Sequence, residues 1–280
     1  MKKIKLKNNQ SITAIILTFN EEIHIERCIK SIVNIVDNII VIDSFSTDQT
    51  LKICKNFKNV KIYKRKFINQ ANQINWALKN LTINSNWILR IDADEYLTKY
   101  SRKFFKKKLI KNNNSDGIIL TRKISFLNKI INYGSTSPHK SLRIWKNKRG
   151  KYDNSQVDEQ VIVKGKISET DLVLIDDNLK GLYFWTIKHI NYASREAYEY
   201  FRNSKKVKIN KDPSKENKKY KFQIYYKLPL IIRPFLFFMY SYFYKLGFFA
   251  GVRGFLYYLI QTLLYRLLVD FFIIKRMIFR

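Results

Sequence analysis

Three acidic residues, Asp92, Asp94 and Glu95, directly follow an apolar run at residues 87–91. The run has the length and composition of a buried strand, and in extended backbone the side chains at i and i+2 leave the same face. We therefore expect Asp92 and Asp94 to converge on one point. Paired carboxylates suit Mg²⁺ or Mn²⁺, which take one or two carboxylates together with phosphate oxygens and water. The alternative is that Asp94 and Glu95 only favour the N-terminus of a following helix.

The elements that must position these acids alternate between strand and helix. Apolar runs at residues 12–19, 38–42, 60–63 and 87–91 predict four strands, and the segments between them carry apolar residues at helical spacing. Short connections between such elements favour right-handed βαβ units and a parallel sheet. The sequence therefore predicts an α/β fold, whose ligands bind beyond the carboxyl ends of the strands.

Polar residues at the ends of the first, second and fourth of these strands are expected along one edge of the sheet: Thr18, Asn20, Asp43, Ser44, Asp92 and Asp94. No G-x-G-x-x-G motif follows the first strand, which disfavours a dinucleotide site. The polar, acidic edge suits a nucleotide held by hydrogen bonds to its base and ribose, with a metal on its diphosphate. We also expect Asn20 to cap the first helix, and Ser46 with Gln49 to form a capping box for the second.

The rest of the chain is less regular. A basic helix is predicted at residues 103–111, and further strands at 117–122, 141–145 and 161–163. We expect a catalytic domain at 1–210, with a nucleotide-binding half at about 10–98 and an acceptor half at about 99–210. The charged segment 211–220 reads as a linker, and residues 221–280 as a helical membrane-interface region.

Composition implies an anionic partner. The 280 residues carry a formal charge of +31, which is typical of chains that bind nucleic acid, phosphate-rich substrates or acidic lipid. Nucleic acid is disfavoured, because no compact surface of interleaved aromatic and basic residues is evident outside the tail. Cys28 and Cys54 lie in apolar helical patterns without zinc spacing, so we expect reduced core thiols. The basic, apolar N-terminus lacks a small-residue cleavage site and reads as the first strand.

The tail at residues 228–280 is rich in aromatic and aliphatic residues that charges interrupt. A spanning helix needs about 20 predominantly apolar residues, and no charge-free run here is that long. We therefore expect the tail to lie in the membrane interface, with its apolar faces in the lipid boundary and its cations at anionic headgroups. The alternatives are packing onto the globular domain or a sister subunit, and short re-entrant insertion.

Four motifs together resemble the family 2 glycosyltransferases with the GT-A fold. They are T-F-N-E-E (18–22), V-I-D-S-F-S-T-D-Q-T (41–50), N-Q-I-N-W-A-L (72–78) and D-A-D-E (92–95). The chain is most similar to the bacterial lipopolysaccharide-core β-1,4-glucosyltransferase-like branch, over roughly its first two thirds. Two later segments, L-R-I-W (142–145) and V-D-E-Q (157–160), occupy the places of an L-R-L-F-like and a V-H-E-like segment in that branch.

The resemblance implies how a UDP-sugar donor is bound. The uridine would be held by Thr18, Asn20, Asp43 and Ser44, while Gln73 and Asn75 would lie near the ribose or diphosphate. Asp94, with Asp92, would bind the Mg²⁺ or Mn²⁺ ion that bridges the phosphates. Arg90 or Arg143 would add positive charge near the leaving group, or else be an ordinary surface cation.

The resemblance also implies a catalytic base. Inversion at the anomeric carbon needs one base on the face opposite the leaving group, and Glu159 is the first candidate, with Asp158 second. The alternative is that both are ordinary strand-edge acids. His189 resembles a histidine that some relatives place near the metal, and its alternative is a structural role. The chain departs from the family at Phe45, where glycine is common, at Asp158, which replaces a histidine, and at residues 137–139.

The implied activity is an inverting, metal-dependent transfer of a hexose from a UDP-sugar, with UDP-glucose as one candidate. The acceptor would be lipid-linked or a lipopolysaccharide, capsule or other surface glycan, at the cytoplasmic face of the inner membrane. A sugar nucleotidyltransferase would share the sheet and the metal but would want a glycine-rich loop after the first strand, which is absent. A basic membrane-peripheral or nucleic-acid-binding protein without catalysis is the remaining alternative.

Overall fold

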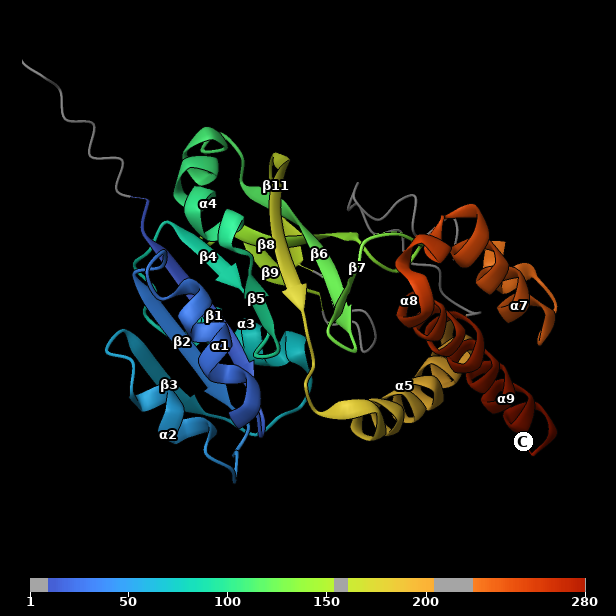
Figure 1. Cartoon of the computed structure of the whole chain (residues 1–280). Coiled ribbons are helices and arrows are strands. Elements are labelled where there is room, and N and C mark those ends of the chain that lie inside the picture. Colours follow the sequence, from blue (N-terminus) through green and yellow to red (C-terminus); the bar gives the residue numbers. More distant parts are fainter. Residues whose placement is uncertain (1–9, 154–160, 204–223, 280) are drawn as a thin grey trace, which may run out of the picture. The chain divides into compact units, whose positions relative to one another are not determined.

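The computed structural model describes residues 10–153, 161–203 and 224–279 (Figure 1). These residues belong to two compact units. The first comprises the chain up to Arg122 together with Lys140–Asp176, and the second comprises Lys123–His139 and Asp177–Arg280. The predicted linker at 211–220 lies outside the described residues. The helix that follows residue 180 packs with the C-terminal helices, and the compact units divide near residue 176. The domain boundary at 210 stays a prediction.

A nine-stranded sheet in the order β3-β2-β1-β4-β8-β6-β11-β5, with β7 beside β6, dominates the described residues. Its strands are β1 (Ile12–Thr18), β2 (Asn38–Asp43), β3 (Val60–Lys64), β4 (Trp87–Arg90), β5 (Glu95–Leu97), β6 (Gly117–Phe126), β7 (Lys129–Ile131), β8 (His139–Lys146) and β11 (Ile167–Asp176). The first four strands are parallel, and β4 pairs antiparallel with β8. A second, two-stranded sheet joins β9 (Gly150–Tyr152) to β10 (Val161–Val163).

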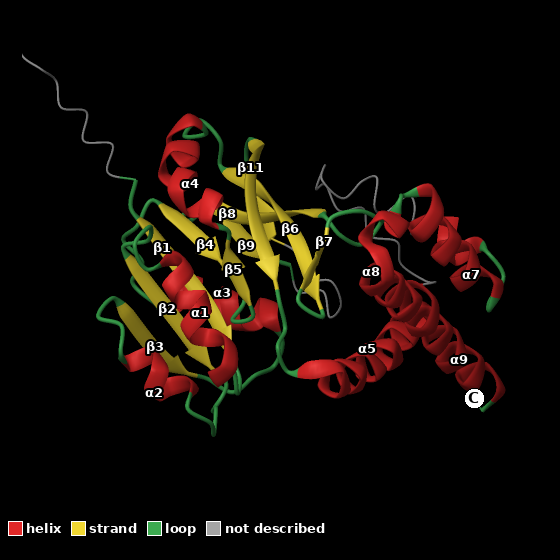
Figure 2. Cartoon of the chain, in the orientation of Figure 1, coloured by secondary structure: helices red, strands yellow, loops and turns green. Residues whose placement is uncertain are grey.

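Helices cover both faces of the parallel strands (Figure 2). They are α1 (Glu22–Ile32), α2 (Thr50–Lys55), α3 (Gln70–Asn80) and α4 (Lys99–Lys111). Side chains of β1 alternate between two apolar layers, so that Ile16 packs with Cys28 and Phe105, whereas Ile15 packs with Ile74 on the face that α3 covers. The predicted α/β architecture is confirmed, and Cys28 and Cys54 are buried free thiols.

The two predicted helix caps are wrong. Helix α1 begins at Glu22 and α2 at Thr50, and the residues that precede them, Glu21 and Gln49, make no side-chain cap hydrogen bond. The polar side chains expected to cap these helices bond to a neighbouring loop instead. The Asn20 side chain accepts the N–H of Thr47 at 2.8 Å, and the Ser46 hydroxyl accepts the N–H of Asn20 at 2.9 Å. Hydrogen bonds between loops that are distant in sequence therefore outweigh the capping propensity of Asn20 and Ser46.

The second unit is mainly helical. It contains α5 (Gly181–Asn203), α7 (Ile232–Met239), α8 (Gly251–Tyr258) and α9 (Tyr265–Ile278), with short π- or 3₁₀-helical turns at residues 240–244, 247–250 and 259–264. Helix α5 packs against α9 through small and branched side chains such as Ala193 and Ile273. Tyr257 and Tyr258 of α8 pack against Phe126 at the end of β6.

Charges in the tail are paired within this unit. Arg233 and Asp270 are fully buried, and the Arg233 Nε donates to Asp270 at 2.9 Å. Arg266 donates to Glu196, which also accepts the Tyr265 hydroxyl at 2.7 Å. These charges were the reason for disfavouring a membrane span. Among the described residues, the 32-residue helical run Gly247–Ile278, which contains an 18-residue window with a mean hydropathy of 1.5, is long and apolar enough to cross a membrane.

We predict that Arg233→Met lowers the free energy of unfolding by about 3–5 kcal/mol, because Asp270 stays buried without its cation. Adding Asp270→Asn removes that charge but keeps an acceptor for the Ile231 N–H, so it should restore part of the loss. Denaturation in detergent micelles, followed by helical circular dichroism, measures both variants. The control is Lys275→Met, at an exposed position of α9, the helix that carries Asp270. Equal effects of Arg233→Met and Lys275→Met would show that the buried pair is unimportant.

Candidate active site

The carboxylate of Asp43 organises the ends of the first two strands. Asp43 is fully buried, and the parallel register places it beside Thr18. The Thr18 hydroxyl donates to one carboxylate oxygen at 3.0 Å, and the Ser46 N–H donates to the other at 2.8 Å. A buried carboxylate must be satisfied in this way. The predicted meeting of Thr18 and Asp43 at one edge of the sheet is confirmed.

The loop after Asp43 is tied to the loop after β1. The Asn20 N–H donates to the Ser46 hydroxyl at 2.9 Å, and Asn20 itself has a positive φ of 52°. Phe45 has a φ of 64° and is 54% exposed. This left-handed conformation is the one that glycine adopts without cost, so the turn keeps a glycine-like backbone although its residue is phenylalanine.

Gln73 extends this cluster from helix α3. Its amide donates to the Ser44 hydroxyl at 3.2 Å and to the Arg65 carbonyl at 3.1 Å. The Arg65 guanidinium donates to its amide oxygen at 2.7 Å. Asn75, two residues further along and therefore on a different side of the helix, instead bonds to the backbone of Tyr152, donating at 2.9 Å and accepting at 2.8 Å. Gln73 therefore lies with the strand-end residues, while Asn75 fixes α3 to β9.

The acidic residues after β4 form a tight turn. The Glu95 N–H donates to the Asp92 carbonyl at 3.0 Å, and the Asp92 N–H donates to the Glu95 carboxylate at 2.9 Å. The expectation of extended backbone at Asp92–Asp94 is therefore wrong, and the direction of these two carboxylates is set by a turn. The helix-terminus alternative is also wrong, because α4 begins only at Lys99 and has no acid in its first turn.

Buried arginines surround this turn. Arg90 donates to Asp92 at 2.9 Å, and Arg143 lies 3.3 Å from the other oxygen of Asp92 and 2.5 Å from Glu95. Arg122 contacts Glu95 at 2.8 Å. Arg90 and Arg143 are only 7% and 5% exposed, so the surface-cation alternative is wrong for both. Their positive charge lies inside the protein, next to the acidic turn.

The two bonded acids differ in their titration. Burial alone would raise the pKa of Asp92, but the charges of Arg90 and Arg143 hold it well below its usual range. Burial raises the pKa of Glu95 to about 7, and the negative charge of Asp92 also raises it while Arg143 opposes the shift. Asp92 is therefore anionic at neutral pH, whereas Glu95 exchanges its proton near neutrality.

The carboxylate oxygens of the acidic turn are suitable ligands for a hard divalent cation. The side chain of Asp92 is 26% exposed despite its two arginines, and Asp94 is half-buried. No group of three or more His, Cys, Asp or Glu side chains that could hold a metal occurs among the described residues. Mg²⁺ bound to a nucleotide needs only one or two carboxylates, since phosphate oxygens and water complete its shell. Asp94 and Asp92 supply such a pair.

Three candidates from the sequence remain. Glu159 and Asp158 fall outside the described residues, between β9 and β10. His189 lies on α5 of the second unit, where its ring stacks on Trp185 with centroids 3.5 Å apart. Its Nδ1 lies 2.8 Å from the Trp185 carbonyl oxygen, and burial lowers the pKa of the imidazole. Packing of this kind is typical of a structural histidine.

Several residues that build the site were not foreseen from the sequence. Arg122 and Asp176 extend the charge cluster, and the Tyr152 hydroxyl accepts from Arg90 at 2.8 Å. Ser46 satisfies Asp43. Ser46 lies inside a recognised motif, which was a usable signal. Arg122 and Tyr152 come from strands far away in the sequence, and no spacing pattern links them to the acidic turn.

Comparisons with known proteins identify the family of the chain. The model of glycosyl transferase family 2 matches residues 13–163. An uncharacterized glycosyltransferase of Rickettsia felis is 42% identical over 90 residues, which are 32% of this chain and 31% of that protein. The lipopolysaccharide core biosynthesis glycosyltransferase LpsC of Rhizobium meliloti is 27% identical over 165 residues, 56% of this chain and 58% of LpsC. The chain therefore spans well under two thirds of either relative.

The comparison with solved structures found a fold of limited similarity to this chain. The crystal structure of S. aureus TarS 1-349 in complex with UDP-GlcNAc has a TM-score of 0.48 and 15% sequence identity, and the alignment covers 93% of this chain and 90% of that one.

We predict that Arg143→Met lowers the free energy of unfolding of the first unit by about 3–5 kcal/mol, because the buried Glu95 and the partly buried Asp92 lose a shared cation. Urea unfolding followed by tryptophan fluorescence measures the change, since Trp87 and Trp145 are buried in this unit. Arg149→Met removes a guanidinium that is 62% exposed and should cost less than about 1 kcal/mol. A loss no larger than that of the control would contradict the structural role of Arg143.

Proposed function

The chain belongs to glycosyl transferase family 2, and we propose that it transfers a hexose from a UDP-sugar to a glycan or lipid-linked acceptor, with inversion at the anomeric carbon. UDP-glucose is the first donor to test. Family membership disfavours the sugar nucleotidyltransferase and the non-catalytic nucleic-acid-binding alternatives.

The observation that carries the proposal is the cluster of polar side chains at the carboxyl ends of β1, β2 and β4. β1 lies between β2 and β4 in the sheet, so Thr18, Asp43 and the acidic turn after Arg90 follow three adjacent parallel strands. Ligands of such sheets bind at this edge. In our proposal, Thr18, Asn20, Asp43 and Ser44 hold the uridine, with Gln73 beside them.

The acidic turn would act on the diphosphate. Asp94 and Asp92 would hold Mg²⁺ or Mn²⁺, and the ion supplies charge neutralisation on UDP as the bond from the sugar C1 to oxygen breaks. Arg90 and Arg143 keep Asp92 ionised and fix its orientation through the contacts described above. Their role in this proposal is to position the carboxylate, because both guanidinium groups are buried and already bonded to acids.

The catalytic base is proposed from the family motif. Glu159 would take the proton of the acceptor hydroxyl on the face opposite UDP, with Asp158 as the second candidate. Both lie in the segment between β9 and β10. Asn75 bonds to the backbone of Tyr152, the last residue of β9, so helix α3 holds the start of this segment.

The acceptor and the location of the enzyme are proposed from the second unit and from LpsC. Large apolar side chains stand exposed on the second unit, among them Val252 at 78%, Tyr244 at 74% and Phe249 at 61%. Exposed apolar surface of this kind favours contact with a membrane. Together with the LpsC relative, it supports a surface-glycan acceptor at the cytoplasmic face of the inner membrane, with the enzyme peripheral or monotopic.

We predict metal-dependent release of UDP when the protein is screened against a panel of UDP-sugars with Mg²⁺ or Mn²⁺, and its loss in EDTA. Asp94→Asn should reduce this release at least about a hundredfold, since even second-shell changes at metal sites cost about 10–100-fold. Glu169→Gln, which alters an acid whose side chain is 56% exposed, is the control. Release that survives both EDTA and Asp94→Asn would exclude the proposed metal site.

A second prediction separates chemistry from donor binding. Glu159→Gln should leave the affinity for UDP in the presence of metal within about twofold, while turnover falls by about 10²–10⁴, the usual contribution of a general base. Isothermal titration with UDP and an assay of glycan transfer measure the two quantities. Full turnover in Glu159→Gln would move the role to Asp158, whose Asn variant would then show the loss.

A further inference from the structure

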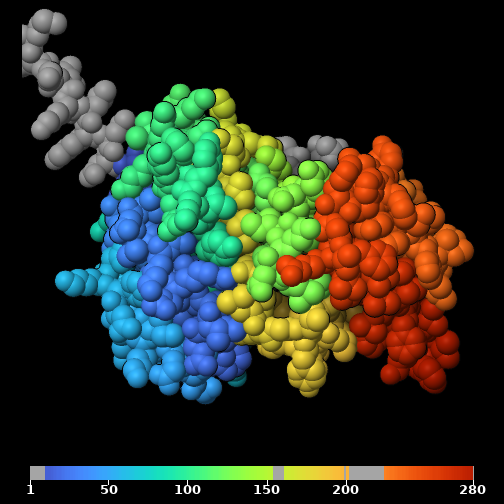
Figure 3. Space-filling view, in the orientation of Figure 1, coloured from blue at the N-terminus to red at the C-terminus, as the bar shows by residue number. Residues whose placement is uncertain are grey.

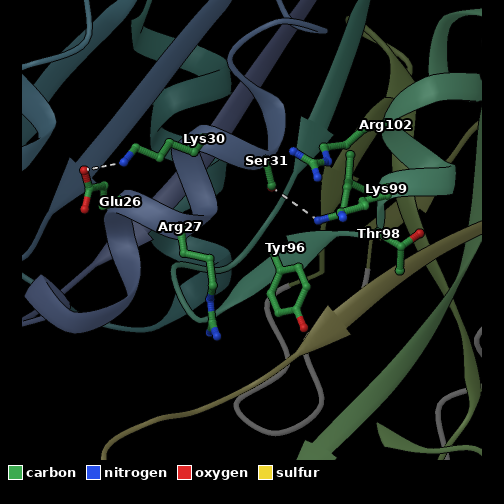
Figure 4. A pocket seen from close by; sticks show the side chains of 9 residues that line it. Glu26, Arg27, Lys30, Ser31, Tyr96, Thr98, Lys99 and Arg102 are labelled. Atoms are coloured by element: carbon green, nitrogen blue, oxygen red, sulfur yellow. Dashed lines mark hydrogen bonds and ion pairs between the residues drawn. The ribbon is translucent and has the colours of Figure 1, made fainter. Parts of the chain in front are cut away.

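A pocket of about 430 Å³ lies on the first unit, where the C-terminal half of α1 meets β5 and the start of α4 (Figure 4). It lies alongside helix α1, whereas the proposed donor residues follow the carboxyl ends of β1, β2 and β4. Its volume is in the range of small-molecule sites, about 300–1,000 Å³. The pocket is therefore large enough to take a ligand of its own.

The lining of this pocket is strongly basic. Arg27 and Lys30 come from α1, and Lys99 and Arg102 come from the first turn of α4. Its acidic lining residue, Glu26, lies 2.7 Å from Lys30. Four cations and one paired carboxylate leave the lining with an excess of positive charge, which favours an anion.

Hydrogen bonds within the first unit fix the walls of the pocket. The Leu97 N–H donates to the Ser31 hydroxyl at 3.2 Å, which joins β5 to α1. Thr98 caps α4 by accepting the Ser101 N–H at 3.2 Å. The Arg27 guanidinium lies over the Tyr96 ring, 4.7 Å from its centroid. The cations therefore project from two helices held in place by the sheet, which limits the reorganisation that binding would require.

We propose that this pocket binds a phosphate-bearing anion, with a diphosphate group as the best match to its charge. Phosphate oxygens accept several charge-assisted hydrogen bonds at once, which arginine and lysine supply together. Helix α4 adds long-range attraction, because it contains no acid and its exposed residues include Lys103, Lys106 and Lys107. The side chains of this helix form part of the molecular surface in Figure 3.

The pocket also contacts the acidic turn. The Arg27 Nη2 donates to the carbonyl oxygen of Asp94 at 3.5 Å, so a ligand held by Arg27 is one side chain away from the backbone of the proposed metal site. The same chemistry would suit the headgroup phosphate of an acidic lipid or a soluble diphosphate. The proposal stands on the pocket and its charge, and does not require the transferase activity.

The test is isothermal titration of the full chain with inorganic pyrophosphate in EDTA, so that a divalent ion at the acidic turn contributes nothing. We expect one binding site that weakens with added salt. The double variant Lys99→Gln/Arg102→Gln should weaken binding at least about tenfold, because it removes two charge-assisted contacts. Lys106→Gln/Lys107→Gln removes the same charge from the same helix outside the pocket and should change the affinity by less than about threefold.

Equal weakening by the two double variants would overturn the proposal in favour of diffuse attraction to a basic helix, and absence of pyrophosphate binding would overturn it outright. Asp94→Asn should bind pyrophosphate normally in EDTA, so failure of the proposed metal site would leave this result unchanged. Sedimentation with phosphatidylglycerol or phosphatidylcholine vesicles distinguishes the sources. A lipid headgroup predicts that Lys99→Gln/Arg102→Gln selectively loses phosphatidylglycerol binding, whereas a soluble diphosphate predicts loss of pyrophosphate binding alone.

Discussion

The shared contact of Arg143 with Asp92 and Glu95 is the constraint on which the acidic turn depends. Two carboxylates this close repel each other, and burial in a medium of low polarity increases the cost. The arginine lies on β8, the antiparallel neighbour of β4, so the extension of the parallel sheet by an antiparallel strand supplies the cation. The turn can then keep Asp92 ionised and Glu95 bonded to the backbone, which holds Asp94 at a defined place.

A fully buried carboxylate, that of Asp43, plays a similar part at the end of β2, on the other side of β1 from β4. Asp43 accepts from Thr18 and from both the N–H and the hydroxyl of Ser46, and it uses neutral donors where Asp92 uses arginine. The difference fits the proposed chemistry. At the proposed uridine site, Asp43 is satisfied by hydroxyl and N–H donors, whereas Asp92 has compensating positive charge beside the proposed diphosphate site. Both sets of contacts join segments that are distant in the sequence at one edge of the sheet.

Sequence patterns predicted the strands and helices well because periodicity reflects local burial, as Ile15 and Ile16 show by packing on opposite faces of β1. They also placed Thr18 and Asp43 together, since parallel strands share an edge. They failed where long-range hydrogen bonds outweighed local preference. Asn20 and Ser46 have good capping propensity but bond across loops, and Asp92 leaves the extended path because Glu95 closes a turn. For Arg143 the sequence left open a role beside the leaving group or a place on the surface, because the partner strand that buries it cannot be read from spacing.

The net charge of the chain conceals two populations of cations. Arg90, Arg122 and Arg143 are bonded to acids within the first unit, and Arg233 is likewise bonded to Asp270 in the second. Planar guanidinium groups suit such buried, multiply bonded positions, whereas lysine stays hydrated. The exposed residues of α4 are accordingly mostly lysines. Interaction with anions in solution is therefore governed by the exposed lysines and by the few arginines, such as Arg102, that reach the surface, and not by the formal charge as a whole.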